Sequence, residues 1–349
     1  MASLDRELTA GPPPPRAGRW SEYTLLSRQI KQAGLLDRRH GWYAGKIGLN
    51  LALLAAGLVA FFLLGESWWQ LVTAAYLAVV ATQLTFVGHD AGHRQIFRSR
   101  RANDLAGLLH GNLLVGISFG WWVPKHNAHH TNPNDEDLDP DIGIAVLAFT
   151  AAQARGKHGL ARMITRSQAF LFFPLLLLEA AHLHVASIKA IVQGRGRANA
   201  AEALLLLVHL AVYLTALLLV LTPLQAVAFV LVQQGLFGLY LGCSFAPNHK
   251  GMPTLTQADQ VDFLRRQVLT SRNVRGSRFV DFLLGGLNYQ IEHHLFPSMP
   301  RPNLRRAQPL VREFCRHHGL LYAEASLVGS YAEALRHLHS VSAPLRPAA

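Results

Sequence analysis

Histidines stand in short clusters whose spacing suits metal binding. His89 and His93 (HDAGH) lie four residues apart, so on a helix both rings project from one face. His126, His129 and His130 (HNAHH) have the i, i+3, i+4 spacing, which also selects one helical face. We therefore expect two helices that each present imidazoles in one direction.

A third cluster repeats the second spacing with one substitution. QIEHH places Gln290, His293 and His294 on one helical face, with a glutamine where the pattern would take a third histidine. His249 (PNHKG) directly follows a long apolar run. Because an amide ligates iron weakly, Gln290 is expected to leave one metal more open or to bind through water.

These clusters predict a site for more than one metal ion. Imidazole suits iron, zinc, copper or nickel, and eight histidines exceed the needs of one tetrahedral site. The two cysteines, Cys243 and Cys315, are too few for a cysteine-ligated iron–sulfur cluster. Redox iron used with dioxygen is the preferred interpretation, and zinc fits the ligand type too.

Carboxylates near the clusters are candidates for fixing the imidazole tautomers. They equally suit ordinary helix caps and turns, above all within NPNDEDLDPD. The candidates are Asp90, Asp135, Asp139, Asp141 and Glu292.

The other histidines are expected to have roles other than ligation. Those inside apolar runs suit cavity linings or hydrogen bonds: His110, His182, His184 and His209. Metal ligation is least firmly set aside for His182 and His184. The rest are expected to be solvated: His40, His158, His317, His318, His337 and His339.

Apolar runs dominate the elements that must hold these clusters. Half of the 349 residues are hydrophobic, and a bilayer span takes about 20 apolar residues. Four runs approach that length and form two hairpins: Ile47–Gly65, Trp69–Gly88, Ala203–Leu221 and Leu224–Phe245. Two weaker runs are expected to be interfacial, re-entrant or cavity-lining: Leu105–Trp122 and Ala169–Val185.

The distribution of basic residues favours one orientation in the membrane. Neither hairpin turn contains Lys or Arg, whereas the opposite ends of the runs carry many. The positive-inside rule then places both termini and the clusters on the cytoplasmic side of the cell's inner membrane. The net charge of +12 follows from basic loops against anionic lipid, or marks a docking surface for an acidic protein. Nucleic-acid binding is not expected, because no such motif appears.

The chain divides into three parts. Residues 1–46 are expected to form a disordered N-terminus and, from residue 21, a basic interfacial helix. Residues 47–320 form the membrane domain, and residues 321–349 form a cytosolic tail. The predicted fold class is an all-α integral membrane protein with four transmembrane helices in two hairpins.

HDAGH, HNAHH and QIEHH, in this order, resemble the three histidine boxes of the integral-membrane fatty acid desaturases. The similarity extends to GISFGWWVPKHNAHHTNPN, FAPNHKGMP and LNYQIEHHLFPSMPRPNL and covers roughly residues 45–320. The glutamine of the third box resembles the front-end branch and its bacterial linoleoyl-CoA desaturase-like relatives.

This resemblance implies a cytosolic helical cap and a di-iron centre, with Gln290 near or on the metal. The implied reaction is oxygen-dependent formation of one cis double bond in a long acyl chain carried by CoA or a lipid. The implied ligands are His89, His93, His126, His129, His130, His249, His293 and His294. Many front-end enzymes carry a fused cytochrome b5 with an HPGG motif, which this sequence lacks. Electrons are therefore expected from a separate ferredoxin, flavodoxin or NAD(P)H reductase.

An acyl substrate calls for an apolar tunnel between the helices and the cap. Candidate lining residues, each equally suited to membrane packing, are Phe86, Phe119, Trp121, Trp122 and Phe245.

Two other functions fit parts of the pattern. A di-iron membrane hydroxylase or ketolase shares the boxes, although the complete QIEHHLFP context favours desaturation. A metal transporter is the remote alternative, because transporters tend to place ion sites near the bilayer midplane, whereas these clusters lie at helix ends.

Overall fold

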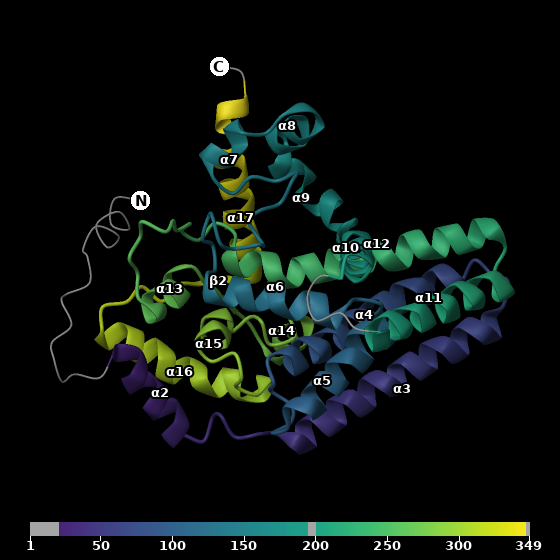
Figure 1. Ribbon diagram of the computed structural model, residues 1–349, viewed down its shortest axis with the longest axis horizontal. Coiled ribbons are helices and arrows are strands. Elements are labelled where there is room, and N and C mark those ends of the chain that lie inside the picture. Colours follow the sequence, from purple (N-terminus) through teal and green to yellow (C-terminus); the bar gives the residue numbers. More distant parts are fainter. Residues whose placement is uncertain (1–20, 195–199, 347–349) are drawn as a thin grey trace.

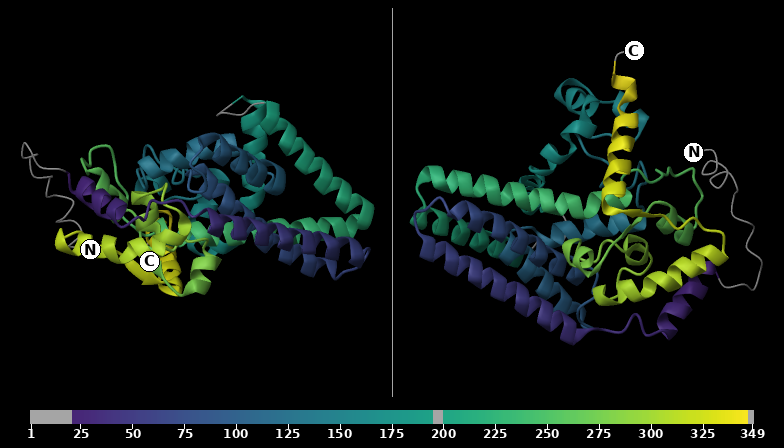
Figure 2. Two further views of the ribbon diagram at one scale, coloured as in Figure 1. Left: turned by 90° about the horizontal axis from the view of Figure 1, so that it is seen from below. Right: turned by 180° about the vertical axis from the view of Figure 1, so that it is seen from behind.

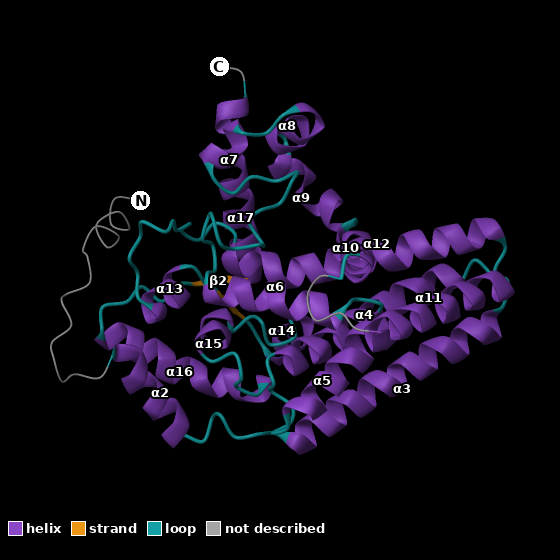
Figure 3. Cartoon of the chain, in the orientation of Figure 1, coloured by secondary structure: helices purple, strands orange, loops and turns teal. Residues whose placement is uncertain are grey.

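The computed structural model describes residues 21–194 and 200–346, and helices make up nearly all of its regular structure (Figures 1 and 3). The disorder predicted for residues 1–20 lies outside these residues. Within the described ranges the sheet structure is one parallel pair, β1 (Asn273–Arg275) and β2 (Glu324–Ser326), with Asn273 opposite Glu324. The predicted all-α class is confirmed.

Four helices have the length and apolar composition to cross a membrane, as predicted. They form two hairpins and extend to a common end in Figure 2. Thr222 caps the last of them by accepting the Gln225 backbone N–H, and Pro223 takes the first helical position, where no N–H is needed. The four are α3 (His40–Leu64), α4 (Gln70–Gly92), α11 (Ala200–Val220) and α12 (Pro223–His249).

The two weaker apolar runs form bent helix pairs, each a broken span or a re-entrant segment. In one, Gly116 ends a π-helical turn with a φ of 82°, a conformation that glycine adopts without strain. The bends are 113° between α5 (Arg100–Leu108) with η1 (Leu109–Val115) and α6 (Phe119–Thr131), and 68° between α9 (Gln168–Leu176) and α10 (Glu179–Val192).

A helical cap covers the ends of α4, α6 and α12 that lie away from the hairpin turns (Figure 1). Its apolar core includes Leu26, Leu264, Ile291, Leu295 and Val311. The stretch predicted as one interfacial helix from residue 21 is instead a short helix, a turn and the start of α3. The short helix buries Leu26 and Ile30 in the apolar core of the cap. The cap helices are α2 (Glu22–Gln32), α13 (Phe263–Leu269), α15 (Gln290–Leu295) and α16 (Arg301–His317).

The last described helix, α17 (Leu327–Val341), packs against α9 and α12. The buried Arg272 ties this region together, because its guanidinium donates to the carbonyls of Pro247 (2.7 Å) and Lys250 (2.9 Å) and pairs with Glu333. Short helices complete the fold: α7 (Ala151–Arg155), α8 (Gly159–Arg166), α14 (Arg278–Leu283) and the 3-10 turn η2 (Ala343–Leu345).

Candidate metal centre

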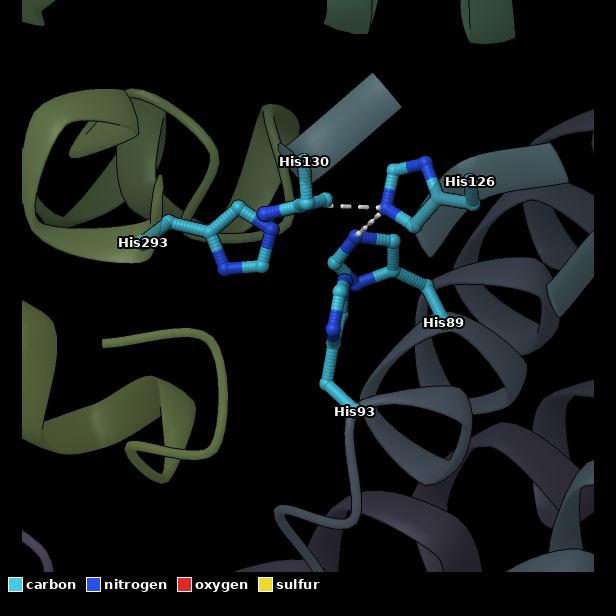
Figure 4. Close-up of side chains that lie close together, drawn as sticks. All are labelled: His89, His93, His126, His130 and His293. Carbon is cyan, nitrogen blue, oxygen red and sulfur yellow. Dashed lines mark hydrogen bonds between the residues drawn. The ribbon is translucent and has the colours of Figure 1, made fainter. Parts of the chain in front are cut away.

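Five histidines from three helices converge with one ring nitrogen each within 4.8 Å of the others (Figure 4). α4 supplies His89, and His93 follows directly as the C-cap of that helix; α6 supplies two rings at the same i, i+4 spacing, and α15 supplies one. The Nε2 atom of His126 lies 3.2 Å from that of His89 and 3.2 Å from that of His130. The group consists of His89, His93, His126, His130 and His293.

A second group lies directly beside the first and consists of His129, His249 and His294. The Nε2 atom of His249 lies 3.3 Å from that of His129 and 3.1 Å from that of His294. The rings of His294 and His130 stack with their centroids 4.1 Å apart, so the two groups are in direct contact. The structure thus brings all eight predicted histidines together, in two adjacent sets.

The outer hydrogen bonds of the second group fix which nitrogen carries the proton. His129 Nδ1 lies 2.9 Å from an Asp139 oxygen, and His249 Nδ1 lies 2.9 Å from the Thr270 carbonyl. His294 Nδ1 lies 2.9 Å from the side-chain oxygen of Gln267. Each of these oxygens accepts, so each Nδ1 donates and each Nε2 presents a lone pair.

Three lone pairs that face one another at 3.1 to 3.3 Å repel unless a cation lies between them. The orientation of Gln267 supports this assignment, because its amide nitrogen donates to the His130 carbonyl at 3.0 Å. Imidazole nitrogens bound at about 2.0 to 2.1 Å around one ion have mutual separations of this size. The second group therefore fits a metal ion.

The first group also has ring nitrogens that a metal ion would satisfy. Several of its nitrogens are buried and have no partner within the described part of the chain, among them His93 Nε2 and both ring nitrogens of His293. Burial, together with the neighbouring histidines, holds the pKa of His293 well below the usual value. Neutral imidazole is the form that binds metal, so this set fits a metal ion as well.

The predicted carboxylates differ in their contacts with these histidines. Burial is the largest single influence on the pKa of Asp139 and would raise it, but the hydrogen bond from His129 and the charges of His129 and Lys250 together lower it. Asp141 lies 3.7 Å from the same ring and pairs with Lys125. Asp135 instead accepts backbone N–H groups in its own loop, including that of Asp137 at 3.1 Å. Its role is that of a turn former.

Asp90 joins the first group to the cap. One carboxylate oxygen lies 3.4 Å from His89 Nδ1, and the other lies 2.6 Å from the Arg301 guanidinium and 3.0 Å from the Tyr43 hydroxyl. Arg301 also donates to the Phe86 carbonyl at 2.5 Å. This buried network fixes α4 against α3 and α16.

Glu292 does not contact the histidine rings, unlike its predicted role beside the metal. Its carboxylate accepts from Asn273 (2.7 Å) and from the Tyr322 hydroxyl (2.6 Å). Burial raises its pKa to about 7, even though both hydrogen bonds favour the ionised form. Glu292 therefore anchors α15 to β1.

Gln290 lies at the edge of the second group. Its amide nitrogen is placed 2.8 Å from His249 Nε2, and its amide oxygen accepts from Asn248 at 3.2 Å. The Asn248 amide nitrogen also donates to the carbonyls of Ser244 (3.2 Å) and Leu287 (3.1 Å), so the Gln290 oxygen faces Asn248 and the Gln290 amide nitrogen faces the second group. Gln290 thus lies beside the second group and presents an N–H to it.

A cavity of about 60 Å³ reaches His89, and its other lining residues are almost all apolar. Three of the five predicted aromatic residues line it: Phe119, Trp122 and Phe245. Trp122 also stacks on His126 with ring centroids 4.3 Å apart. Phe86 and Trp121 lie outside this cavity. Phe86 packs under the cap against Gly285, where a Cβ would come within 2.5 Å of its ring, and Trp121 packs in the helix bundle.

The remaining histidines stay outside both groups. His110, His184 and His209 each hydrogen-bond a backbone carbonyl at 2.8 Å, as predicted for polar groups in apolar runs. His318 and His337 differ from the predicted solvation, because they are half-buried and bond the carbonyls of Phe314 and Phe149.

Sequence reasoning missed the partners that orient the rings. Thr270 orients His249 through its backbone carbonyl, a group that every residue has, so the sequence does not reveal this contact. Gln267, Tyr43 and Arg301 lie far along the chain from the histidines that they support, and no spacing links them to the clusters.

Helices with the length and composition to span a membrane, around two groups of buried histidines that could hold metal ions, are features of a membrane protein with a metal site. A model described as "Fatty acid desaturase" matches residues 66–326. The chain therefore belongs to the fatty acid desaturase family and is an oxidoreductase, as the histidine boxes suggested.

Individual relatives agree with this assignment. The chain is 28% identical to a Delta(8)-fatty-acid desaturase of Helianthus annuus, over 93% of this chain and 74% of that protein. It is 32% identical to the Delta(5) fatty acid desaturase fat-4 of Caenorhabditis elegans, over 86% and 69%. It is 31% identical to an Acyl-lipid (9-3)-desaturase of Physcomitrium patens, over 86% of this chain and 59% of that protein.

Proposed function

We propose that this protein introduces one cis double bond into a long-chain acyl group of an acyl-CoA or acyl-lipid, using dioxygen and two external electrons. The observation that carries the proposal is the junction of two buried histidine groups with an apolar cavity at His89. The reaction balances as –CH2–CH2– + O2 + 2 electrons + 2 protons giving –CH=CH– + 2 H2O.

Each histidine group would hold one iron ion. Five histidines would bind the first, and His129, His249 and His294, with Gln290 beside them, would bind the second. Unactivated C–H bonds resist acid–base side chains, so bound iron would supply the oxidising chemistry.

The chain's own residues position the substrate and keep water out. Phe119, Trp122 and Phe245 line the cavity and would hold two adjacent methylene groups beside His89. Trp122 has a further role, because its stacking on His126 closes the histidine group on the cavity side. Asp139 and Asp90 hold His129 and His89 in the orientation that presents Nε2 inward.

The membrane location and the redox partner complete the proposal. Residues 47–320 would form the catalytic domain, after an N-terminal segment (1–46) and before a cytosolic tail (321–349). The exposed arginines that follow His93 would face the cytoplasm at the inner membrane: Arg94, Arg98, Arg100 and Arg101. They suit an acidic electron carrier, such as a ferredoxin, a flavodoxin or a reductase.

Lipid mass spectrometry tests the proposal directly. The chain is expressed aerobically, with a matched reductase, in a host of simple lipid composition, beside a His293→Ala variant. We expect wild-type lipids to contain acyl chains lighter by two mass units, and the variant to give none. A gain of sixteen mass units would identify a hydroxylase instead. Unchanged acyl chains accompanied by metal movement across the membrane would indicate a transporter.

A further inference from the structure

A buried carboxylate lies in the membrane region outside both histidine groups. Glu202 belongs to the first turn of α11, and only 2% of its surface is exposed. Its carboxylate accepts from the Ser118 hydroxyl at 2.6 Å and, more weakly, from the Asn112 amide at 3.4 Å. The same amide lies 3.5 Å from the Glu202 backbone carbonyl. Ionisable side chains within membrane-spanning helices are costly and tend to be functional.

The start of α6 is held by the two residues that bind Glu202. Ser118 caps the helix, because its hydroxyl oxygen accepts the Trp121 backbone N–H at 3.1 Å. The Asn112 side-chain oxygen accepts the Phe119 backbone N–H at 3.0 Å. Both contacts satisfy N–H groups that have no partner within the helix itself. Glu202 therefore orients both side chains on which α6 begins.

Close packing around Glu202 brings three helices together at this junction. A Cβ at Gly120 would come within 2.1 Å of a Glu202 carboxylate oxygen, so a larger residue at this position would displace the carboxylate. On the α10 side, the Ser187 hydroxyl accepts the Ser118 backbone N–H at 3.0 Å and donates to the Leu183 carbonyl at 2.8 Å. α6, α10 and α11 thus meet at Ser118 and Glu202.

The segment at this junction forms a large part of the cavity wall at His89. Leu183, whose carbonyl accepts from Ser187, lines the cavity too. Trp122 packs against α4, because a Cβ at Gly92 would come within 2.9 Å of its ring. The position of this wall relative to His89 therefore depends on the hydrogen bonds at Glu202. The lining residues between positions 111 and 122 are Gly111, Val115, Ile117, Phe119 and Trp122.

We propose that Glu202 is a positioning residue, which fixes the wall of residues 111–122 before an acyl chain arrives and so sets which methylene groups lie beside His89. The inference rests on the proposed function, because that function makes an acyl chain the occupant of the cavity. A wall that is already ordered costs the bound chain little, whereas a loose wall must be ordered by binding. Polar side chains also join membrane helices without any such role. That role alone would change stability and leave the register of the chain in the cavity unaltered.

Fluorescence quenching in the metal-free protein measures where the chain lies, without iron or turnover. Dibromostearates with the bromines at successive carbons are added to the purified full-length chain in detergent, because bromine quenches only nearby tryptophan. The signal of Trp122 is the difference between each protein and the same protein carrying Trp122→Phe. We expect quenching in wild type to peak at one bromine position and to disappear with excess stearate.

Variants at the junction assign the peak to Glu202. Glu202→Leu removes the acceptor, and we expect about tenfold weaker stearate binding, the effect of one strong hydrogen bond, with quenching spread over several positions. Ser118→Ala breaks the same bond from the α6 side, should act alike, and serves if the first variant does not fold. Glu202→Gln retains one acceptor oxygen and should keep the wild-type profile, with affinity within about twofold.

Gln70→Leu is the matched control for loss of a buried polar side chain. Gln70 is equally buried in a membrane helix, donates to the carbonyls of Phe61 (2.7 Å) and Gly65 (2.9 Å) and does not line the cavity. Its replacement should lower thermal stability and leave the quenching profile unchanged.

Several results would overturn the inference. They are a flat profile in wild type, an unchanged profile and affinity in both Glu202→Leu and Ser118→Ala, or equal spreading in Gln70→Leu. A Glu202→Gln variant as impaired as Glu202→Leu would also contradict it, because the acceptor oxygen would then not hold the wall. The expected profiles together with an absence of double bonds in the lipid assay would refute the proposed function alone.

Discussion

Replacing Asp139 by asparagine tests how the second histidine group is held. The Asp139 carboxylate accepts from His129 Nδ1 (2.9 Å) and from the backbone N–H groups of Asn134 (2.7 Å) and Asp141 (2.8 Å). An amide removes the charge and turns one NH2 group toward a donor. His129 then loses the partner that holds its Nε2 lone pair toward the metal.

The expected loss follows from that geometry. Partners that orient a ligating histidine contribute about 10- to 100-fold in metal affinity, which is about 1.4 to 2.7 kcal/mol. We expect Asp139→Asn to weaken one iron per chain by that factor, while the iron in the five-histidine group keeps its affinity. The assay is competition for iron between the purified protein and a chelator of known strength, followed by metal analysis.

Asp137→Asn is the matched control. It makes the same chemical change two residues away, on an exposed side chain of the same loop. We expect wild-type iron affinity from this variant. Equal affinity in both variants and wild type would refute the reasoning, because Asp139 would then have no part in holding His129.

Three further predictions follow from the same contacts. His129→Ala should abolish product formation without preventing membrane insertion, as measured by lipid analysis beside membrane fractionation; retained activity would remove His129 from the ligand set. Gln290→Ala should lower activity less than tenfold and keep the iron content, and loss of one iron would make this amide a true ligand. Glu292→Gln should lower stability by about 1 to 3 kcal/mol, because an amide hydrogen then faces the Asn273 or Tyr322 donor. Thermal unfolding in detergent measures this change, and an unaltered midpoint would contradict the anchoring role of Glu292.

Most of the site could be predicted from the histidine spacing, because helical periodicity relates residues that are close in the sequence. On α6 the same periodicity explains the aromatic residues: Trp122 precedes His126 by four residues and shares its face, whereas Trp121 is turned away by about 100°. Sequence could therefore have separated these two tryptophans. The four long apolar helices could be predicted equally well, because a bilayer span requires only sufficient length and an apolar composition.

Contacts between distant segments were beyond such reasoning. The i, i+3 spacing places Phe86 on the same helical face as His89, yet Gly285 and Arg301 of distant segments cover Phe86. The same holds for Gln267, which orients His294 only because α13 packs against α15. Glu292 was placed near the metal by its neighbours in sequence, but a helix turns adjacent side chains apart, and it faces β1 instead.

Anomalous diffraction at the iron absorption edge tests the central claim most directly. Crystals of the aerobically purified protein should show two iron peaks per chain, one inside the five-histidine group and one between His129, His249 and His294. The peaks should vanish in data collected just below the iron edge. A single peak, or two peaks that persist below that edge and appear at the zinc edge, would contradict the account.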